Sequence, residues 1–173
     1  MYCGALTLGA LLKESGAALW LAQSFLHILG SVGMDKGLGL WVGLSGLSGL
    51  MTNFMSDAGT TALLGPIVIP MGIMTGVPGE PWAVGLGVAF ATSFAHFLIV
   101  GTPNNAIVYG LGVYPDSGEK MIHPMDFVKY GFFLWLISMV IVWIIGFVVI
   151  YNVVGFPDGL LETASSVLNK GAM

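Results

Sequence analysis

The sequence predicts an all-α polytopic membrane protein, and three observations support that fold class. Hydrophobic residues make up 56% of the chain and charged residues only 8%, whereas an average soluble domain is roughly 25% charged. The mean hydropathy is +0.91. Asp57 is the single ionisable residue between Lys36 and Glu80. Apolar sequence on this scale indicates burial in lipid, and a lone carboxylate at membrane depth indicates a functional site.

Composition excludes several classes of protein. There is no arginine, and the five lysines are scattered rather than clustered, so the basic face that a nucleic-acid-binding protein needs is absent. Cys3 is the only cysteine, which rules out an internal disulfide and a cysteine-based zinc site. The amino terminus lacks the basic region of a signal peptide. We therefore expect a portion of a longer membrane protein.

The first half of the chain is expected to form an arm and a hairpin. Residues 1–29 are apolar apart from a polar step at 13–16, which predicts the end of a transmembrane helix followed by an interfacial arm. Residues 38–74 predict a re-entrant hairpin with its tip at 55–60. Its two apolar segments would cover roughly 25 and 21 Å at 1.5 Å per residue, less than the ~30 Å hydrocarbon core.

The second half is expected to contain a broken helix and a plain one. Residues 81–113 form an apolar run that we expect to break at 101–105, because Pro103 lacks an amide donor and disfavours helix before it. Residues 126–156 are apolar without interruption and long enough to span. The cations near 120–129 favour a cytoplasmic loop at 114–129. Two interrupted helices are typical of secondary transporters, so the breaks should meet near the midplane.

At these two breaks the chain resembles the divalent anion/sodium symporter family, which carries dicarboxylates, citrate or sulfate. The family's hairpin motif is Thr-Glu-x-x-Ser-Asn-Thr-Ala-Thr, and its broken-helix motif is Ala-Thr-Pro-Pro-Asn-Ala-Ile-Val. The corresponding stretches here are Thr52-Asn53-Phe54-Met55-Ser56-Asp57-Ala58-Gly59-Thr60 and Gly101-Thr102-Pro103-Asn104-Asn105-Ala106-Ile107-Val108. Order and spacing agree over nearly the whole chain, which corresponds to the second of the family's two inverted repeats.

The resemblance implies a function and a set of site residues. The function is secondary active symport of a small di- or multivalent anion with sodium, with no organic cofactor and no enzymatic reaction. The sodium ligands implied are Thr52, Ser56, Asp57 and the carbonyl of Gly101. The substrate contacts implied are Ser56, Asp57, Ala58, Thr102, Pro103 and Asn105. The remaining repeat would come from the same gene or a second chain, and the complete carrier is expected to be a homodimer in the plasma (inner) membrane.

Three of the departures from the motifs leave the details of coupling open. Asp57 stands where the family has asparagine, Ala58 replaces a hydroxyl, and Asn104 replaces a second proline. The added negative charge strengthens cation binding and repels an anion. Asp57 is therefore a candidate for direct sodium binding, and the alternative is a proton-coupled anion carrier in which Asp57 binds the proton.

Two alternatives from other classes are kept. The sequence Gly43-Leu44-Ser45-Gly46 has the Gly-x-Ser-Gly form of a rhomboid intramembrane protease. Ser45 would then be the nucleophile and His96 the base. The chain could instead be a membrane subunit that only interacts with partners. Polar breaks within apolar helices argue against the second alternative, because a purely structural bundle gains nothing from them.

Overall fold

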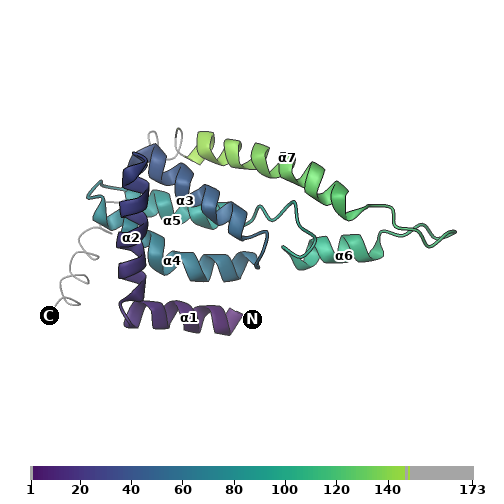
Figure 1. Cartoon of the computed structure of the whole chain (residues 1–173), viewed down its shortest axis with the longest axis horizontal. Coiled ribbons are helices and arrows are strands. Elements are labelled where there is room, and N and C mark those ends of the chain that lie inside the picture. Colours follow the sequence, from purple (N-terminus) through teal and green to yellow (C-terminus); the bar gives the residue numbers. More distant parts are fainter. Residues whose placement is uncertain (1, 147, 149–173) are drawn as a thin grey trace.

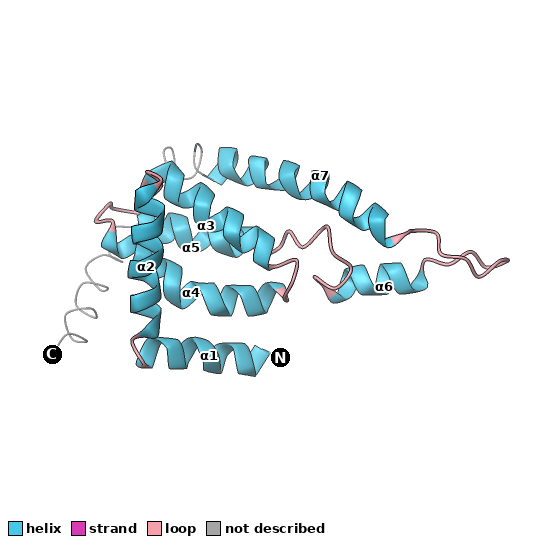
Figure 2. Ribbon diagram, viewed as in Figure 1, coloured by secondary structure: helices cyan, strands magenta, loops and turns pink. Residues whose placement is uncertain are grey.

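The computed structural model describes residues 2–146 and 148, and every regular element within them is a helix (Figure 2). An isolated bridge joins Val113 to Lys120. The all-α fold class is confirmed, and most of the predicted 147–156 portion of the last helix lies outside the described residues. The seven helices are α1 (Tyr2–Glu14), α2 (Ala17–Ser31), α3 (Gly37–Met51), α4 (Asp57–Met74), α5 (Glu80–Ala91), α6 (Pro103–Leu111) and α7 (Pro124–Val142).

The centre of the molecule is the hairpin of α3 and α4, with α5 packed against both helices (Figure 1). Helix α1 lies along α4, and α2 runs across the hairpin rather than parallel to it. Apolar side chains from four helices form the buried core. They are Ala18 and Ala22 of α2, Leu40 and Leu44 of α3, Leu64, Ile67, Val68 and Met71 of α4, and Val84 and Val88 of α5. The hairpin predicted at 38–74 thus has α5 as its third helix.

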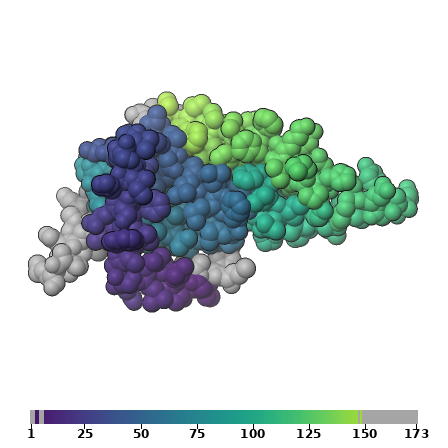
Figure 3. Space-filling view, in the orientation of Figure 1, coloured from purple at the N-terminus to yellow at the C-terminus, as the bar shows by residue number. Residues whose placement is uncertain are grey.

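Helix α7 packs against this centre along a single stripe. Gly131, Trp135 and Met139, at four-residue spacing, are its buried residues, and they form one face of the helix. The remaining faces are apolar and exposed, as at Phe133, of which 61% is exposed. Figure 3 shows that α6 and α7 continue beyond the end of the hairpin. A helix that is apolar all round and buried on only one side is suited to contact with lipid.

Two of the described segments are long and apolar enough to cross a membrane. These are α4 and the helical stretch from Pro124 to Gly146. Helix α3 has 15 residues and would cover roughly 22 Å, which is shorter than the ~30 Å hydrocarbon core. The short α3 agrees with a hairpin that enters the bilayer without crossing it, and the re-entrant course stays a prediction.

Both interruptions begin earlier in the chain than the sequence indicated. The non-helical tip covers residues 52–56, because Ser56 caps α4 and Asp57 already belongs to its first turn. Helix α5 ends at Ala91, so the break extends over residues 92–102 rather than 101–105. Pro103 is the first residue of α6, where its fixed φ suits a helix start and its missing amide removes no helical hydrogen bond. The proline therefore begins the second half of the broken helix.

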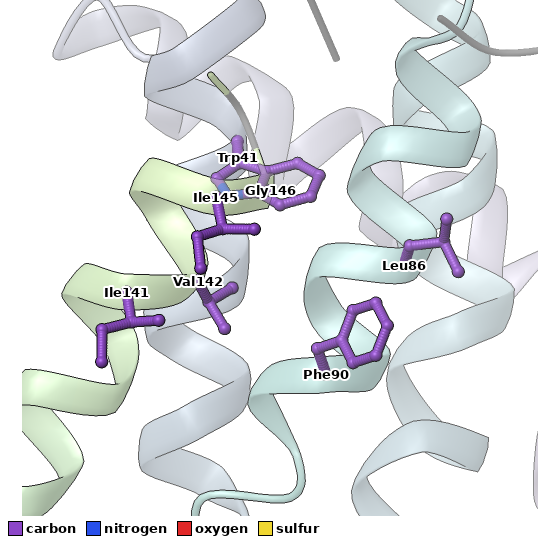
Figure 4. Close-up of a pocket in the computed structure, with 7 residues that line it drawn as sticks. All are labelled: Trp41, Leu86, Phe90, Ile141, Val142, Ile145 and Gly146. Carbon is purple, nitrogen blue, oxygen red and sulfur yellow. The ribbon is translucent and has the colours of Figure 1, made fainter. Parts of the chain in front are cut away.

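An apolar pocket of about 180 Å³ lies between α3, α5 and the end of α7 (Figure 4). The side chains that line it are Trp41, Leu86, Phe90, Ile141, Val142, Ile145 and Gly146. Its lining contains no carboxylate or hydroxyl group, so it is separate in chemistry from the polar breaks.

The indole of Trp135 attaches α7 to the hairpin. Its Nε1 donates to the carbonyl oxygen of Gly49 at 3.0 Å, and its ring packs edge-on against Phe97. We expect Trp135→Phe to keep the ring packing and lose the hydrogen bond, which costs about 1 kcal/mol of stability. Trp20→Phe, at a side chain that is 66% exposed, is the control. Thermal unfolding of the purified protein measures both, and equal melting temperatures for the two variants would contradict the role assigned to this hydrogen bond.

Candidate functional site

The tip of the hairpin ends in a capped helix start that carries a carboxylate. Ser56 has extended backbone angles, and its hydroxyl oxygen accepts a hydrogen bond from the amide of Gly59 at 3.2 Å. Asp57 follows as the first residue of α4. A hydroxyl cap and an acidic residue in the first turn both stabilise a helix N-terminus. The local sequence Ser56-Asp57 therefore fixes where α4 begins and places a carboxylate at the tip.

Asp57 takes part in a network of threonines that joins the tip to α5. The Thr52 hydroxyl, which is fully buried, lies 2.8 Å from Asp57 Oδ1 and 2.5 Å from the Thr92 carbonyl oxygen. The Thr61 hydroxyl lies 3.0 Å from that of Thr92. A hydroxyl has one proton, so Thr52 donates fully to only one of its two oxygen partners. A proton on Asp57, or a cation beside it, would balance these closely spaced oxygens.

The break between α5 and α6 is held by side chains in place of helical hydrogen bonds. The Thr102 hydroxyl oxygen caps α6 by accepting from the Asn105 amide at 3.3 Å. The Asn105 side-chain nitrogen donates to the carbonyl oxygens of Ala95 at 2.7 Å and Leu98 at 2.9 Å. Irregular backbone inside a membrane protein needs such partners, because lipid supplies none.

The tip and the break are in direct contact. The buried Asn53 side chain accepts from the Phe97 amide at 3.1 Å and donates to the Phe94 carbonyl oxygen at 3.4 Å. On the other side, a Cβ atom added to Gly101 would lie 3.0 Å from the Asn53 carbonyl oxygen. Only glycine permits so close an approach without a shift of backbone. The two polar interruptions, about 45 residues apart in sequence, thus form one region.

The comparisons with known proteins agree with this arrangement of breaks. Residues 1–170 match the family described as "Citrate transporter". The chain belongs to the citrate transporter family. This membership confirms the resemblance inferred from the two motifs, and it favours a transporter over an enzyme. The chain is accordingly an integral membrane protein.

Three relatives illustrate how similar this chain is to known transporters. An uncharacterized transporter of Methanocaldococcus jannaschii is 36% identical over 121 residues, covering 70% of this chain and 26% of the relative. An uncharacterized transporter of Haemophilus influenzae is 34% identical over 147 residues, covering 85% and 29%. The sodium-dependent dicarboxylate transporter SdcS of Staphylococcus aureus (strain USA300) is 29% identical over 155 residues, covering 90% and 27%. The chain thus spans less than a third of the length of these relatives.

The residues predicted to bind sodium are divided between the two breaks. Thr52 and Asp57 are in hydrogen-bond contact, Ser56 directly precedes Asp57 at the helix cap, and Gly101 lies close to Asn53. Among the described residues no hydrogen bond to the Gly101 carbonyl oxygen is found. No group of three or more His, Cys, Asp or Glu residues suited to a metal occurs in the described part of the chain. A cation here would be held by hydroxyl, carbonyl and single carboxylate oxygens, which suit a hard ion.

The residues predicted to contact the substrate are of two kinds. Ser56 and Pro103 are exposed, and Ala58 and Thr102 are partly buried, near the N-termini of α4 and α6. Asn105 differs from them, because both hydrogens of its amide nitrogen are donated to the break. The observed contacts of the Asn105 side chain support the backbone of the break. A substrate contact through its side-chain oxygen stays a prediction.

Three polar residues of this region are not among the residues predicted to bind sodium or substrate. Asn53, Thr61 and Thr92 join the tip, α4 and the break. Asn53 lies inside the hairpin motif, and Thr92 is the first hydroxyl after a long apolar run, which is the only sequence signal that singles them out. Their partners lie 31 to 44 residues away in the chain, so pattern alone does not reveal them.

The geometry of Ser45 and His96 does not form a nucleophile–base pair. The Ser45 hydroxyl donates to the Trp41 carbonyl oxygen at 2.5 Å and accepts from Trp143 Nε1 at 2.8 Å. His96 lies in the break, where its ring contacts Phe94. A catalytic serine requires a base within hydrogen-bond reach. Ser45 instead serves helix packing, and the protease alternative has no support in these contacts.

Proposed function

We propose that this chain contributes one cation and anion site to a secondary active carrier of small di- or multivalent anions, of the dicarboxylate, citrate or sulfate type, coupled to sodium. One observation carries the proposal. The start of α4, with Asp57, and the break before α6 are joined by buried and partly buried hydrogen bonds into a single region. Broken helices that meet in this way are the usual binding elements of secondary transporters.

The charges at the site favour an order of binding. The N-termini of α4 and α6 present free amides and the positive ends of helix dipoles, which attract an anion. The Asp57 carboxylate acts in the opposite direction. At about 4 Å and an effective dielectric constant near 20, it repels each anionic charge by roughly 4 kcal/mol. A cation bound beside Asp57 offsets this repulsion, so sodium binds first and the anion follows.

In this proposal the complete carrier contains more than the residues of this chain. The chain covers less than a third of its relatives, so the matching repeat comes from the same gene or from a second chain. Alternating access then moves the two breaks together relative to the rest of the carrier. A homodimer in the plasma (inner) membrane, with the 114–129 loop in the cytoplasm, completes the proposal.

A proton is the second candidate for the coupling ion, and the threonine network is the observation that favours it. Thr52 has two oxygen neighbours and one hydroxyl proton. If Asp57 carries a proton, the carboxyl group donates to Thr52 and Thr52 donates to Thr92, which satisfies all three groups. Uptake by the full-length carrier in liposomes, with a sodium or a proton gradient imposed separately, distinguishes the two coupling ions.

Asp57→Asn tests the role of the carboxylate in the same assay. We expect the half-saturating sodium concentration to rise roughly tenfold, because one charged ligand contributes about 1.4 kcal/mol or more. Any dependence of uptake on a proton gradient is expected to disappear. Asp116→Asn, which removes an exposed loop carboxylate, is the matched control. Sodium and pH dependence unchanged by Asp57→Asn would refute both assignments of Asp57.

A further inference from the structure

The side chain of Asn53 uses all of its hydrogen-bonding groups to connect separate parts of the fold. Its amide nitrogen donates to the Gly49 carbonyl oxygen at 2.8 Å and to that of Phe94 at 3.4 Å. Its oxygen accepts from the Phe97 amide at 3.1 Å. The side chain is fully buried. Asn53 thus links the end of α3 to two backbone groups in the middle of the break.

Two asparagines with different positions in the chain supply side-chain partners to the middle of the break, and Thr52 supplies one to the Thr92 carbonyl oxygen at its start. Asn105 belongs to α6, which directly continues the break, and supports the carbonyls of Ala95 and Leu98. Asn53 belongs to the hairpin tip and reaches the break from outside. Buried backbone groups without partners are costly, so residues 94–97 keep their arrangement only while Asn53 keeps its own. Asn53 is therefore, beside Thr52, one of the contacts by which a change at the tip can reach the break.

Asn53 is also placed where cation binding would act on it. It directly follows Thr52, whose hydroxyl contacts Asp57 at 2.8 Å. Its backbone lies close to Gly101, where an added Cβ would be only 3.2 Å from the Asn53 Cα atom. The Gly49 carbonyl that accepts from Asn53 also accepts from Trp135 of α7. The tip and the break therefore meet at the Asn53 side chain, and α7 is bound to the same Gly49 carbonyl oxygen.

We propose that Asn53 is a positioning residue that couples the hairpin tip to the break, so that sodium bound at the tip also orders residues 92–102. This inference rests on the proposed function. The cation ligands from the tip and the carbonyl oxygen of Gly101 belong to segments far apart in sequence. Asn53 holds the two segments in register, and anion contacts at Thr102 become available only when the cation has ordered both.

Hydrogen–deuterium exchange of the full-length carrier tests the coupling without requiring transport. Peptides covering 52–57 and 92–102 are compared in sodium and in an equal concentration of potassium. In the unmodified carrier, sodium is expected to slow exchange in both peptides. In Asn53→Ala, sodium is expected to slow exchange at 52–57 as before and to protect 92–102 much less than in the unmodified carrier. The half-saturating sodium concentration for uptake should rise roughly tenfold, the equivalent of about 1.4 kcal/mol.

Ser48→Ala is the matched control for a purely structural effect. Ser48 is also fully buried, and its hydroxyl donates from α3 to the Val88 carbonyl oxygen of α5 at 3.0 Å, without touching the break. We expect sodium to protect both peptides in this variant. If Asn53→Ala does not fold, Asn53→Asp replaces it, because aspartate keeps the acceptor for the Phe97 amide and loses both donated bonds. Sodium protection at 92–102 should then be weaker than in the unmodified carrier.

The outcomes separate this inference from the function on which it rests. If sodium protects 92–102 in the Asn53 variant as strongly as in the unmodified carrier, the coupling role is wrong and the sodium site stands. If Ser48→Ala loses protection at 92–102 as well, the effect is general loosening and the coupling role is also wrong. If sodium changes neither peptide in the unmodified carrier, the sodium site itself is refuted, and the inference with it.

Discussion

Gly131→Ala is expected to reduce the stability of the carrier by about 3 kcal/mol, the upper part of the range for overpacking in a well-packed core. A Cβ atom at this position would overlap with the His96 carbonyl oxygen and would lie 2.6 Å from the Phe97 Cα atom. Both are backbone atoms of the break, which no change of rotamer can move aside. Helix α7 would have to shift by about 1 Å to restore van der Waals contact.

The shift would disturb contacts on both sides of the break. Trp135, one turn along α7, would move away from the Gly49 carbonyl oxygen and from the Phe97 ring. The backbone amide of Phe97 also donates the hydrogen bond that the Asn53 side-chain oxygen accepts. We therefore expect the variant to lose transport at temperatures where it remains folded.

Thermal unfolding of the purified carrier, together with uptake below the melting temperature, measures the effect of Gly131→Ala. Gly110→Ala is the control, because Gly110 is a glycine of α6 with nothing within 4 Å of an added Cβ. Alanine there should leave stability unchanged or raise it by roughly 0.5–1 kcal/mol through better helix propensity. Equal melting temperatures for the two variants would show that α7 does not pack this closely on the break.

Sequence reasoning located the two polar breaks because each carries strong local signals. The Ser56-Asp57 pair and the Thr102-Pro103 pair are both helix-start sequences, and the structure places helix starts at both. Caps and prolines act through their own backbone and the next turn. Such features are predictable from a few neighbouring residues, and they were sufficient to expect the breaks to lie at one site.

The extent of the break was not predictable in the same way. Residues 92–100 are mostly apolar and have no proline, so local propensity favours a continued helix. The structure ends α5 at Ala91, where Thr52, Asn53 and Asn105 supply partners to the freed backbone groups. Two of these partners come from the hairpin tip, about 40 residues away. Tertiary contacts of this kind override local propensity, and a single sequence does not display them.

Glu80→Ala is expected to open the base of the hairpin and to cost about 2 kcal/mol, because the partly buried Gly37 amide loses its acceptor and the Thr75 hydroxyl keeps only the Gly72 carbonyl oxygen. Only 1% of Glu80 is exposed. Its carboxylate accepts a hydrogen bond from the amide of Gly37, the first residue of α3, and another from the Thr75 hydroxyl at 2.6 Å. Helix α3 has no side-chain cap of its own, so Glu80 serves as that cap from a distance.

The position of Glu80 also explains how a carboxylate is accommodated where the described residues provide no cationic partner. Glu80 is the first residue of α5 and contacts the first residue of α3, so the positive ends of two helix dipoles face one carboxylate. It thereby joins the starts of α3 and α5 to the end of α4. The hairpin and α5 are thereby held together as one packed unit, with the tip and break at one end and Glu80 at the other.

Two substitutions separate the charge of Glu80 from its hydrogen bonds. Glu80→Gln keeps one acceptor oxygen for the Gly37 amide, and its new amide group can donate to Thr75, so we expect a loss of only about 1 kcal/mol. Glu119→Ala, in the exposed α6–α7 loop, controls for the removal of a carboxylate. Melting temperatures should fall in the order Glu119→Ala, Glu80→Gln, Glu80→Ala, and uptake should fall in the same order. A Glu80→Ala carrier as stable as the Glu119→Ala carrier would mean that the hairpin base is held by apolar packing alone.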